Sequence, residues 1–453
     1  LTFAPLSAQQ VVRGPYLQQG TPDSVVVRWR TDVPTDTAVK FGLDSARLDQ
    51  TAATKWKTTE HIMILEGLAP STKYHYVIGN AEKALGGAEG AGHFITSPKR
   101  GTRQPIRTWV IGDAGTASAK GNEGLQAKVR DAYYSHTGQR HTDLWLMLGD
   151  NAYGTGTDAE YQIAVFDMYR AMLKKSVVWP TLGNHDAGSA ASVTQSGAYY
   201  DMFTLPTLGQ AGGLMSGTEA YYSFDYGNIH YICLDSEGTD RSVGGAMLTW
   251  LKHDLASTKQ DWIVTYWHHP PYTKGSHDSN TEKKLVEMRE NALPILEAGG
   301  VDLCLTGHSH SYERSFLLDG HYGVSSTLTA KMKRDAGDGK PDGQGAYHKA
   351  TLGPGIREGA VYVVAGSSGK VSDKNEKSAA RGFLDHPAML VSLARLGSLV
   401  LDVDGNRLDA TFLSEKGERL DYFSIVKGKD MRRPLSATTS KAPAAKPAVV
   451  RQR

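Results

Sequence analysis

The 453-residue sequence has few cysteines, no long apolar run and little net charge. Two cysteines are too few for a scaffold held by several disulfides or for a zinc module with four cysteine ligands. No run approaches the 18 consecutive apolar residues that suggest a membrane-spanning helix. The 50 Lys and Arg residues almost balance the 48 Asp and Glu residues, giving +2. That balance excludes a dedicated nucleic-acid-binding protein.

The two ends of the sequence differ in composition from the rest. From Lys427 to Arg453 there are eight basic residues and one acidic residue, net +7, together with three prolines. We therefore predict a disordered tail at 428–453. Near the start, Leu6–Ala8 resembles the small-residue end of a signal peptide. Because no Asn lies in an N-x-Ser/Thr sequence, an exported bacterial protein, secreted or in the periplasm or cell envelope, is expected rather than a plant secreted one.

Residues 10–98 have the pattern of an all-β domain. Apolar residues alternate with other residues in Ser24–Arg30 and Lys73–Gly79, the period of half-buried strands. Additional short strands are predicted at three places, namely Ala38–Phe41, His61–Leu65 and His93–Thr96. Short strands at this spacing favour an antiparallel β-sandwich, and Leu68–Tyr74 resembles a loop and strand of fibronectin type III domains. A polar linker follows at 99–105.

From residue 106 to 427, apolar strand-like runs alternate with helix-like stretches. The predicted strands include Thr108–Ile111, Leu144–Leu148, Ile263–Tyr266 and Leu303–Leu305. The predicted helices include Glu123–Tyr134, Tyr161–Leu173, Ala246–Leu255 and Glu282–Ala298. This alternation predicts an α/β domain with buried strands and helices on both faces. Residues 320–358, rich in Gly and Lys, form an insertion for which two alternatives stay open: it folds over the mouth of the site described next, or it is a plain solvated loop.

Five polar clusters lie along this domain, most of them directly after an apolar run. They are Gly112–Gly115, Gly149–Tyr153, Gly183–Asp186, Trp267–Pro270 and Gly307–His310. Loops that follow the carboxyl ends of strands form the binding crevice of an open α/β sheet. A single Gly-Asp turn or buried His is usually structural, whereas five such clusters in this order predict one site.

The residue types in these clusters indicate a metal centre. Asp, Asn, His and Tyr donors without thiolate suit Zn, Mn, Fe or Mg. The donors are too numerous for one tetrahedral ion and sufficient for two ions that share a carboxylate. Two ions a few ångström apart stabilise the attacking and leaving oxygens of a phosphoryl displacement.

The series GDAG, GDNAY, GNHD, YWHH and GHSH resembles the metallophosphoesterase superfamily and, within it, the purple acid phosphatases. The Tyr of the second cluster separates that branch from most other metallophosphoesterases. Arg13–Tyr16 lies near the start of a sandwich similar to the domain that precedes the catalytic domain in the larger plant and bacterial members. The resemblance implies a metallophosphoesterase α/β sandwich at 106–427, with two mixed sheets flanked by helices.

The resemblance also implies the metal ligands. A first, ferric ion would be bound by Asp113, Tyr153 and His310. A second, divalent ion (Fe, Zn or Mn) would be bound by the set Asn184, His268 and His308, with Asp150 bridging the two ions. The fourth cluster departs from the family pattern because Thr265 occupies its Val position. His269 therefore stays an alternative to His268.

The implied activity is hydrolysis of small phosphate monoesters by a metal-bound hydroxide at mildly acidic pH. Asn184, His185 and His277 would contact the substrate, and His185 and His277 are the candidates for protonating the leaving group. A phosphodiesterase or nucleotide-directed hydrolase on the same ligands is an alternative. A non-catalytic binding protein is a more remote one. The sequence makes no prediction of the oligomeric state.

Overall fold

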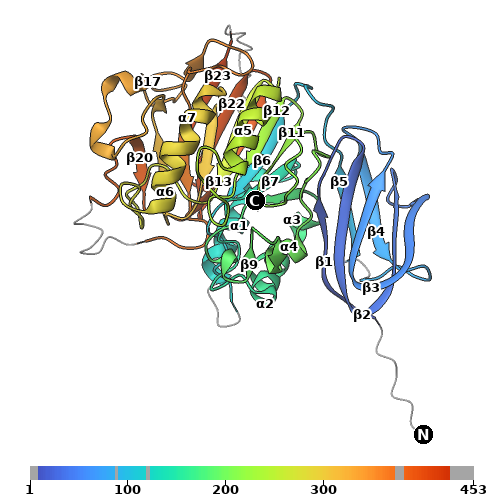
Figure 1. Cartoon of the computed structure of the whole chain (residues 1–453). Helices are drawn as coiled ribbons and strands as arrows, with labels where there is room; N and C mark the ends of the chain where they lie inside the picture. Colours follow the sequence, from blue (N-terminus) through green and yellow to red (C-terminus); the bar gives the residue numbers. More distant parts are fainter. Residues whose placement is uncertain (1–8, 87–89, 119–122, 373–381, 429–453) are drawn as a thin grey trace, which may run out of the picture.

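The computed structural model describes residues 9–86, 90–118, 123–372 and 382–428. It consists of a smaller β part and a larger α/β part, which lie side by side (Figure 1). The signal-like segment Leu6–Ala8 and residues 429–453 of the predicted tail lie outside the described residues, so export and tail disorder stay predictions. None of the helices in the described ranges has the length and apolarity needed to cross a membrane.

The smaller part contains five antiparallel strands. They are β1 (Val11–Gln18), β2 (Ser24–Gly42), β3 (Gln50–Glu66), β4 (Lys73–Gly79) and β5 (Ala91–Ile95). β2 and β3 are longer than the short strands expected at Ala38–Phe41 and His61–Leu65. The register between β2 and β3 shifts between Arg30 and Thr35, which marks an irregularity in the long strands. Before it, β2 pairs with β1, and after it, β2 pairs with β4. The two halves belong to opposite layers, as expected for a sandwich whose long strands bend at bulges.

A separate apolar core fills this sandwich. Val27 and Trp29 from one layer and Tyr76 and Ile78 from the other are each at most 1% exposed and belong to one cluster. The alternation in Ser24–Arg30 predicts one exposed face, but Val26 and Arg28 are buried as well. They are buried because this face packs against the larger part, where the Arg28 guanidinium donates to the carbonyl of Asp201 at 2.6 Å.

The Arg13–Tyr16 segment fixes the sandwich to the larger part. Arg13 is almost fully buried, and its guanidinium donates to Oδ1 of Asp158 at 2.7 Å. The hydroxyl of Tyr16 donates to the carbonyl of Met202 at 2.8 Å. The fold class is confirmed, whereas the exact domain boundaries stay predictions. β5 ends at Ile95 and the next strand begins at Ile106, on either side of the expected linker.

Two seven-stranded mixed sheets form the centre of the larger part. The first has the order β18-β23-β22-β21-β6-β7-β8, with β6 (Ile106–Ile111), β7 (Leu144–Met147), β8 (Val177–Pro180), β18 (Tyr347–Lys349), β21 (Gly397–Asp404), β22 (Arg407–Ser414) and β23 (Arg419–Lys427). The second has the order β11-β12-β13-β14-β19-β15-β20, with β11 (Tyr222–Tyr226), β12 (Ile229–Cys233), β13 (Trp262–Trp267), β14 (Leu303–Thr306), β15 (Tyr312–Ser315), β19 (Val361–Ala365) and β20 (Met389–Leu393). Apolar side chains of both sheets meet in one buried core.

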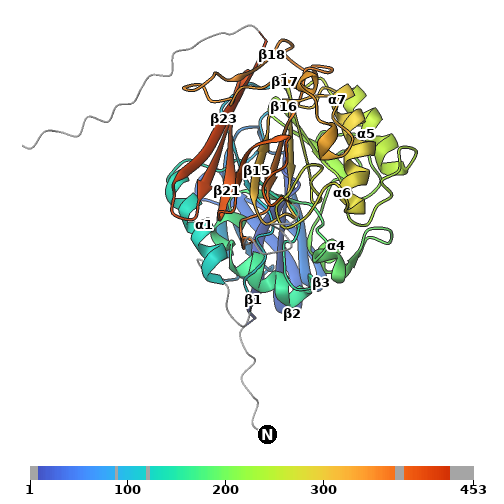
Figure 2. The same cartoon turned by 90° about the vertical axis from the view of Figure 1, so that its left-hand side faces the viewer.

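Helices cover the outer faces of the two sheets. α1 (Glu123–Thr137) lies on one side, and α5 (Ala246–Ser257), α6 (Lys283–Glu287) and α7 (Leu293–Ala298) lie on the other (Figure 2). The helix expected at Tyr161–Leu173 is divided into α2 (Asp158–Tyr161), a π-helical stretch (Gln162–Asp167) and α3 (Arg170–Leu173). A second π-helical stretch (Met288–Ala292) joins α6 to α7. The remaining short elements are α4 (Ala198–Met202), three 3-10 turns (Asp186–Gly188, Ser325–Thr327, Ala330–Met332) and two small sheets, β9 (Ala190–Ala191) with β10 (Ser196–Gly197) and β16 (Leu317–Leu318) with β17 (Lys333–Asp335).

The second half of the insertion at 320–358 does not fold over the mouth of the site. Its last strand, β18, pairs with β23, and Lys349 donates to the carbonyl of Val301 at 3.0 Å, just before β14 begins. The polar clusters follow the opposite, carboxyl ends of β14 and its neighbours. This half of the insertion therefore lies at the other end of the sheets, together with β16 and β17 (Figure 2).

Candidate metal centre

Five loops carry the predicted ligands, and each begins where a strand ends. Three loops follow β6, β7 and β8 of the first sheet, and two follow β13 and β14 of the second. Asp113, Asp150 and His308 have φ angles of 54°, 52° and 65°. Non-glycine residues seldom adopt this left-handed conformation, and such residues cluster at functional sites where the surroundings hold them. A Cβ atom on Gly149 would lie 2.6 Å from Nδ1 of His268, so only glycine fits this close approach.

Three of the predicted ligands form a first group. The hydroxyl oxygen of Tyr153 lies 3.2 Å from Oδ1 of Asp113 and 3.3 Å from Nε2 of His310. Nε2 of His310 lies 3.6 Å from Oδ1 of Asp113. The phenol oxygen of Tyr153, a carboxylate oxygen of Asp113 and a ring nitrogen of His310 thus lie close together, as the ligands of a single ion would.

Three more form a second group next to the first. Oδ1 of Asn184 lies 3.0 Å from Nε2 of His268 and 2.9 Å from Nδ1 of His308. The two ring nitrogens are 3.2 Å apart. One amide oxygen and two imidazole nitrogens therefore converge on a second point.

Asp150 lies between the two groups. Its Oδ1 is 3.4 Å from Nε2 of His268, and ligand atoms of Asp113, Asp150 and His268 all lie within 4.8 Å of one another. All seven predicted ligands are thus brought together by the fold. Asp150 is therefore in a position to serve both groups.

The electrostatics of the cluster suit bound cations. Burial, followed by the charge of Asp150, raises the pKa of Asp113 well above its usual value. Burial also lowers the pKa of His308 to about 3 and that of His310 to about 2. These histidines are therefore neutral near neutral pH and offer lone pairs to a metal. Two carboxylates held this closely repel each other, and a cation between them relieves the repulsion.

The structure favours His268 over His269 as the ligand. Nδ1 of His268 lies 2.8 Å from the carbonyl oxygen of Leu148 and can donate to it, which leaves Nε2 as an acceptor facing Asn184. A nitrogen of His269 lies within 4.8 Å of those of His268 and His308. However, Nδ1 of His269 is 2.9 Å from Oγ of Ser236, and Nε2 faces Glu237 at 3.5 Å. Both nitrogens of His269 thus have other partners.

His185 and His277 lie beside the ligand cluster and are more exposed than it. Nδ1 of His185 lies 2.6 Å from the carbonyl oxygen of Gly154, and its ring packs 4.3 Å from that of Tyr153. The ring of His277 stacks on that of His308 at 3.7 Å. The side chains of His185 and His277 are 35% and 29% exposed, so both can meet a substrate from solvent.

Sequence reasoning missed three residues near the cluster. Glu282 accepts a 2.7 Å hydrogen bond from Nδ1 of His277 and approaches Nε2 of His308 at 3.7 Å. Nζ of Lys370 lies 4.1 Å from the centre of the Tyr153 ring. Lys370 follows Gly366–Gly369 after β19, a Gly-rich turn after a strand that could have revealed it.

Asp186, the last residue of the third cluster, is the third of these residues. Its buried carboxylate accepts from the backbone N–H groups of Asn151 and Gly183 at 3.1 and 2.8 Å and from the hydroxyl of Tyr161 at 2.7 Å. Burial, followed by the charge of Asp150, raises its pKa to about 7. Asp186 therefore ties the second cluster loop to the third, which positions Asp150 and Asn184.

Comparison with known proteins identifies both parts of the chain. Residues 13–96 match the model of the purple acid phosphatase N-terminal domain, and residues 106–312 match that of calcineurin-like phosphoesterases. Purple acid phosphatase 15 of Arabidopsis thaliana is 28% identical over 283 residues, 56% of this chain and 49% of that protein. Human acid phosphatase type 7 is 28% identical over 344 residues, 69% of this chain and 72% of that protein. The chain thus spans about half the length of the first of these relatives.

Solved structures share the fold. The purple acid phosphatase PPD1 from yellow lupin seeds superimposes with a TM-score of 0.67 at 18% identity and covers 92% of this chain and 74% of its own. PhoD superimposes with a TM-score of 0.61 at 15% identity, over 91% of this chain and 88% of its own. At these identities the likeness establishes the two-part architecture and not the activity.

Proposed function

Because this chain belongs to the purple acid phosphatases within the metallophosphoesterase superfamily, we propose that it is a binuclear metal-dependent acid phosphatase acting on small phosphate monoesters. The observation that carries the proposal is the convergence of two ligand groups with Asp150 between them. Neutral histidines and two carboxylates suit a pair of cations, and no thiolate competes for them.

We assign the first ion as ferric and bound by Asp113, Tyr153 and His310. A phenol has an ordinary pKa near 10, so it binds as phenolate only to an ion acidic enough to displace its proton. The second ion, Fe, Zn or Mn in the divalent state, would be bound by Asn184, His268 and His308. When bound, the two ions would supply Lewis acidity to the phosphoryl oxygens and activate water as the nucleophile.

The chain's own residues would bind the ester and handle its proton. Asn184, His185 and His277 lie at the cluster where they can contact phosphoryl oxygens. Burial alone would raise the pKa of Glu282, but hydrogen bonds with His277 and His308 lower it. An ionised Glu282 accepts from Nδ1–H of His277 and so fixes the orientation of this candidate acid. His185 is the other candidate for this role.

An assay with two substrates tests the proposal. The purified holoenzyme is given 4-nitrophenyl phosphate and bis(4-nitrophenyl) phosphate between pH 4 and 9. We expect a higher kcat/KM on the monoester, with an optimum below pH 7. A higher kcat/KM on the diester would support the phosphodiesterase alternative, and no turnover of either ester by protein that holds two metals would contradict the proposal.

A further inference from the structure

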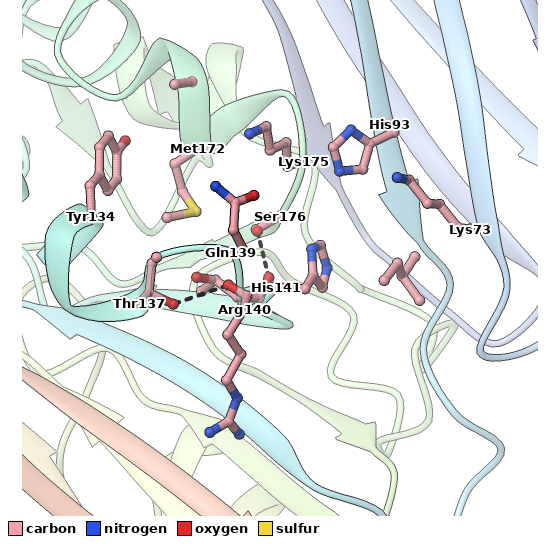
Figure 3. A pocket seen from close by; sticks show the side chains of 14 residues that line it. Lys73, His93, Tyr134, Thr137, Gln139, Arg140, His141, Met172, Lys175 and Ser176 are labelled. Atoms are coloured by element: carbon pink, nitrogen blue, oxygen red, sulfur yellow. Dashed lines mark hydrogen bonds between the residues drawn. The ribbon is translucent and has the colours of Figure 1, made fainter. Parts of the chain in front are cut away.

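A cavity of about 410 Å³ lies where the sandwich meets the larger part. Strands β4 and β5 contribute Lys73 and His93, and the segments before β7 and β8 contribute His141 and Lys175 (Figure 3). The hydroxyl of Tyr76 donates to the carbonyl of Lys174 at 3.1 Å and holds the two parts together here. The cavity lies at the amino-terminal ends of β7 and β8, whereas the candidate metal centre lies at their carboxyl ends.

The lining of this cavity is basic. No Asp or Glu is among the described residues that line it, and neither Lys73 nor Lys175 makes an ion pair with any residue that the structure describes. Arg140 also lines the cavity, but its guanidinium points away and pairs with Asp402 at 2.9 Å (Figure 3). Both lysines are exposed to solvent, and they border this one cavity from different parts of the chain, with no acidic partner among the described residues.

Two histidines complete the lining. Burial and then the nearby positive charges lower the pKa of both His93 and His141 to about 4, and Lys73 and Lys175 contribute to each shift. Nε2 of His141 is buried and has no hydrogen-bond partner among the described residues. Leaving a buried polar atom unpaired costs on the order of 1–3 kcal/mol, so such an atom calls for an explanation. An anion in the cavity would offset both lysines, and a small shift of the His141 ring would let its Nε2–H donate to that anion.

We propose that this cavity is a second anion site, which binds a phosphate group away from the metal centre. Lysine binds phosphate as a point charge, and two lysines match the charge of a phosphate dianion. A cavity in the range of about 300–1,000 Å³ accommodates a small molecule, so the phosphate can be free or part of a small phosphorylated compound. The site goes beyond the proposed phosphatase activity and does not depend on it. Bound phosphate would contact both parts of the chain at once.

Equilibrium dialysis with labelled inorganic phosphate tests this site. Three holoenzymes are compared: wild type, the double variant Lys73→Gln/Lys175→Gln, and the control Lys57→Gln/Lys416→Gln, which removes two exposed lysines elsewhere with the same change in charge. We expect wild type and control to bind one phosphate more per chain than the Lys73→Gln/Lys175→Gln variant. All three should turn over a small aryl phosphate equally when phosphate is absent.

Two further arms sharpen the test. His141→Asn should weaken the same binding step roughly tenfold, because it removes one hydrogen bond to a charged group.

Phenylphosphonate, whose C–P bond a phosphatase does not hydrolyse, replaces phosphate in a parallel series. Tighter binding of the phosphonate would assign the site to phosphorylated compounds, and tighter binding of phosphate would assign it to the free anion. Equal binding of both anions by wild type and Lys73→Gln/Lys175→Gln would overturn the proposal. Because this comparison subtracts any binding at the metal centre, it can fail or succeed independently of the phosphatase assay.

Discussion

Nδ1 of His277 lies 2.7 Å from Oε2 of Glu282, and the same carboxylate oxygen approaches Nε2 of His308 at 3.7 Å. Glu282 therefore connects a candidate acid to a predicted metal ligand. The ligand atoms of His277, Glu282 and His308 also lie within 4.8 Å of one another, a spacing that would suit a third metal-binding group. These two roles for Glu282 have different consequences when it is replaced.

We expect His277→Asn to lower kcat by roughly 10² or more, the range of a positioned acid–base group. Glu282→Gln should lower kcat less, and the double variant should be no worse than His277→Asn, because Glu282 acts through His277. Glu290→Gln, at an exposed residue of the following π-helical stretch, is the matched control. Loss of a metal ion from Glu282→Gln, measured by elemental analysis, would show that Glu282 is a ligand instead.

Tyr153→Phe should remove the visible absorption band of the iron-loaded protein while the fold is preserved. The substitution keeps the ring and deletes only the oxygen that lies 3.2 Å from Asp113. The wild-type protein must first be shown to be coloured, and Tyr221→Phe, at a tyrosine that packs on Trp250, serves as the control. A band unchanged in Tyr153→Phe would exclude this residue as the source of the colour.

His185→Ala should lower turnover by roughly 10² to 10⁴ and leave the metal content intact. Its ring packs on Tyr153 and its Nε2 is 3.9 Å from Oδ2 of Asp150, so it lies outside the two ligand groups. Metal analysis beside the kinetic assay separates the roles. A loss of metal comparable to that of a ligand variant would make His185 a ligand.

His230 provides a test of stability against pH. This buried side chain lies 2.7 Å from Asp225 and 2.8 Å from Asp254, and although burial alone would lower it, these hydrogen bonds raise its pKa to about 9. Because the folded pKa exceeds the unfolded value near 6.5, the protonated ring stabilises the fold fully below about pH 6.5 and loses this effect as the pH rises through about 9.

Denaturant unfolding between pH 6 and 10 checks this effect. We expect His230→Gln to lower the free energy of unfolding by about 3–5 kcal/mol at pH 6, since it breaks a buried charged pair. The difference from wild type should shrink as the pH approaches 10. His253→Gln, at an exposed position of α5, should change little at any pH. A difference for His230→Gln that does not vary with pH would contradict a protonated His230.

The sequence predicts the fold class well, because hydrophobic patterns reflect which residues are buried. The apolar runs at Thr108–Ile111 and Leu144–Leu148 mark strands that are buried on both faces in a central sheet. It does not predict the long β2 strand, since nothing local distinguishes a bend at Arg30 from the end of a strand. The division of Tyr161–Leu173 is missed as well, because a π-helical turn barely alters the apolar pattern.

The sequence also predicts the part of the candidate site whose residues directly follow apolar runs. Asp113 and Asp150 are recognisable because each directly follows an apolar run and a glycine. Glu282 is not, since it precedes a helix and reaches the cluster only through the tertiary fold. The choice between the adjacent His268 and His269 also depends on distant partners, the carbonyl of Leu148 and the hydroxyl of Ser236.

Metal content is the most direct test of a binuclear centre. Wild type, Asp150→Ala and the control Asp49→Ala, at an exposed residue of the sandwich, are reconstituted with iron and zinc and analysed for metal per folded chain. The proposed centre requires two ions per chain in wild type and control, one of them iron, and at most one in Asp150→Ala, because that carboxylate lies between the two ligand groups. Fewer than two ions in the wild type, or two ions retained by Asp150→Ala, would contradict it.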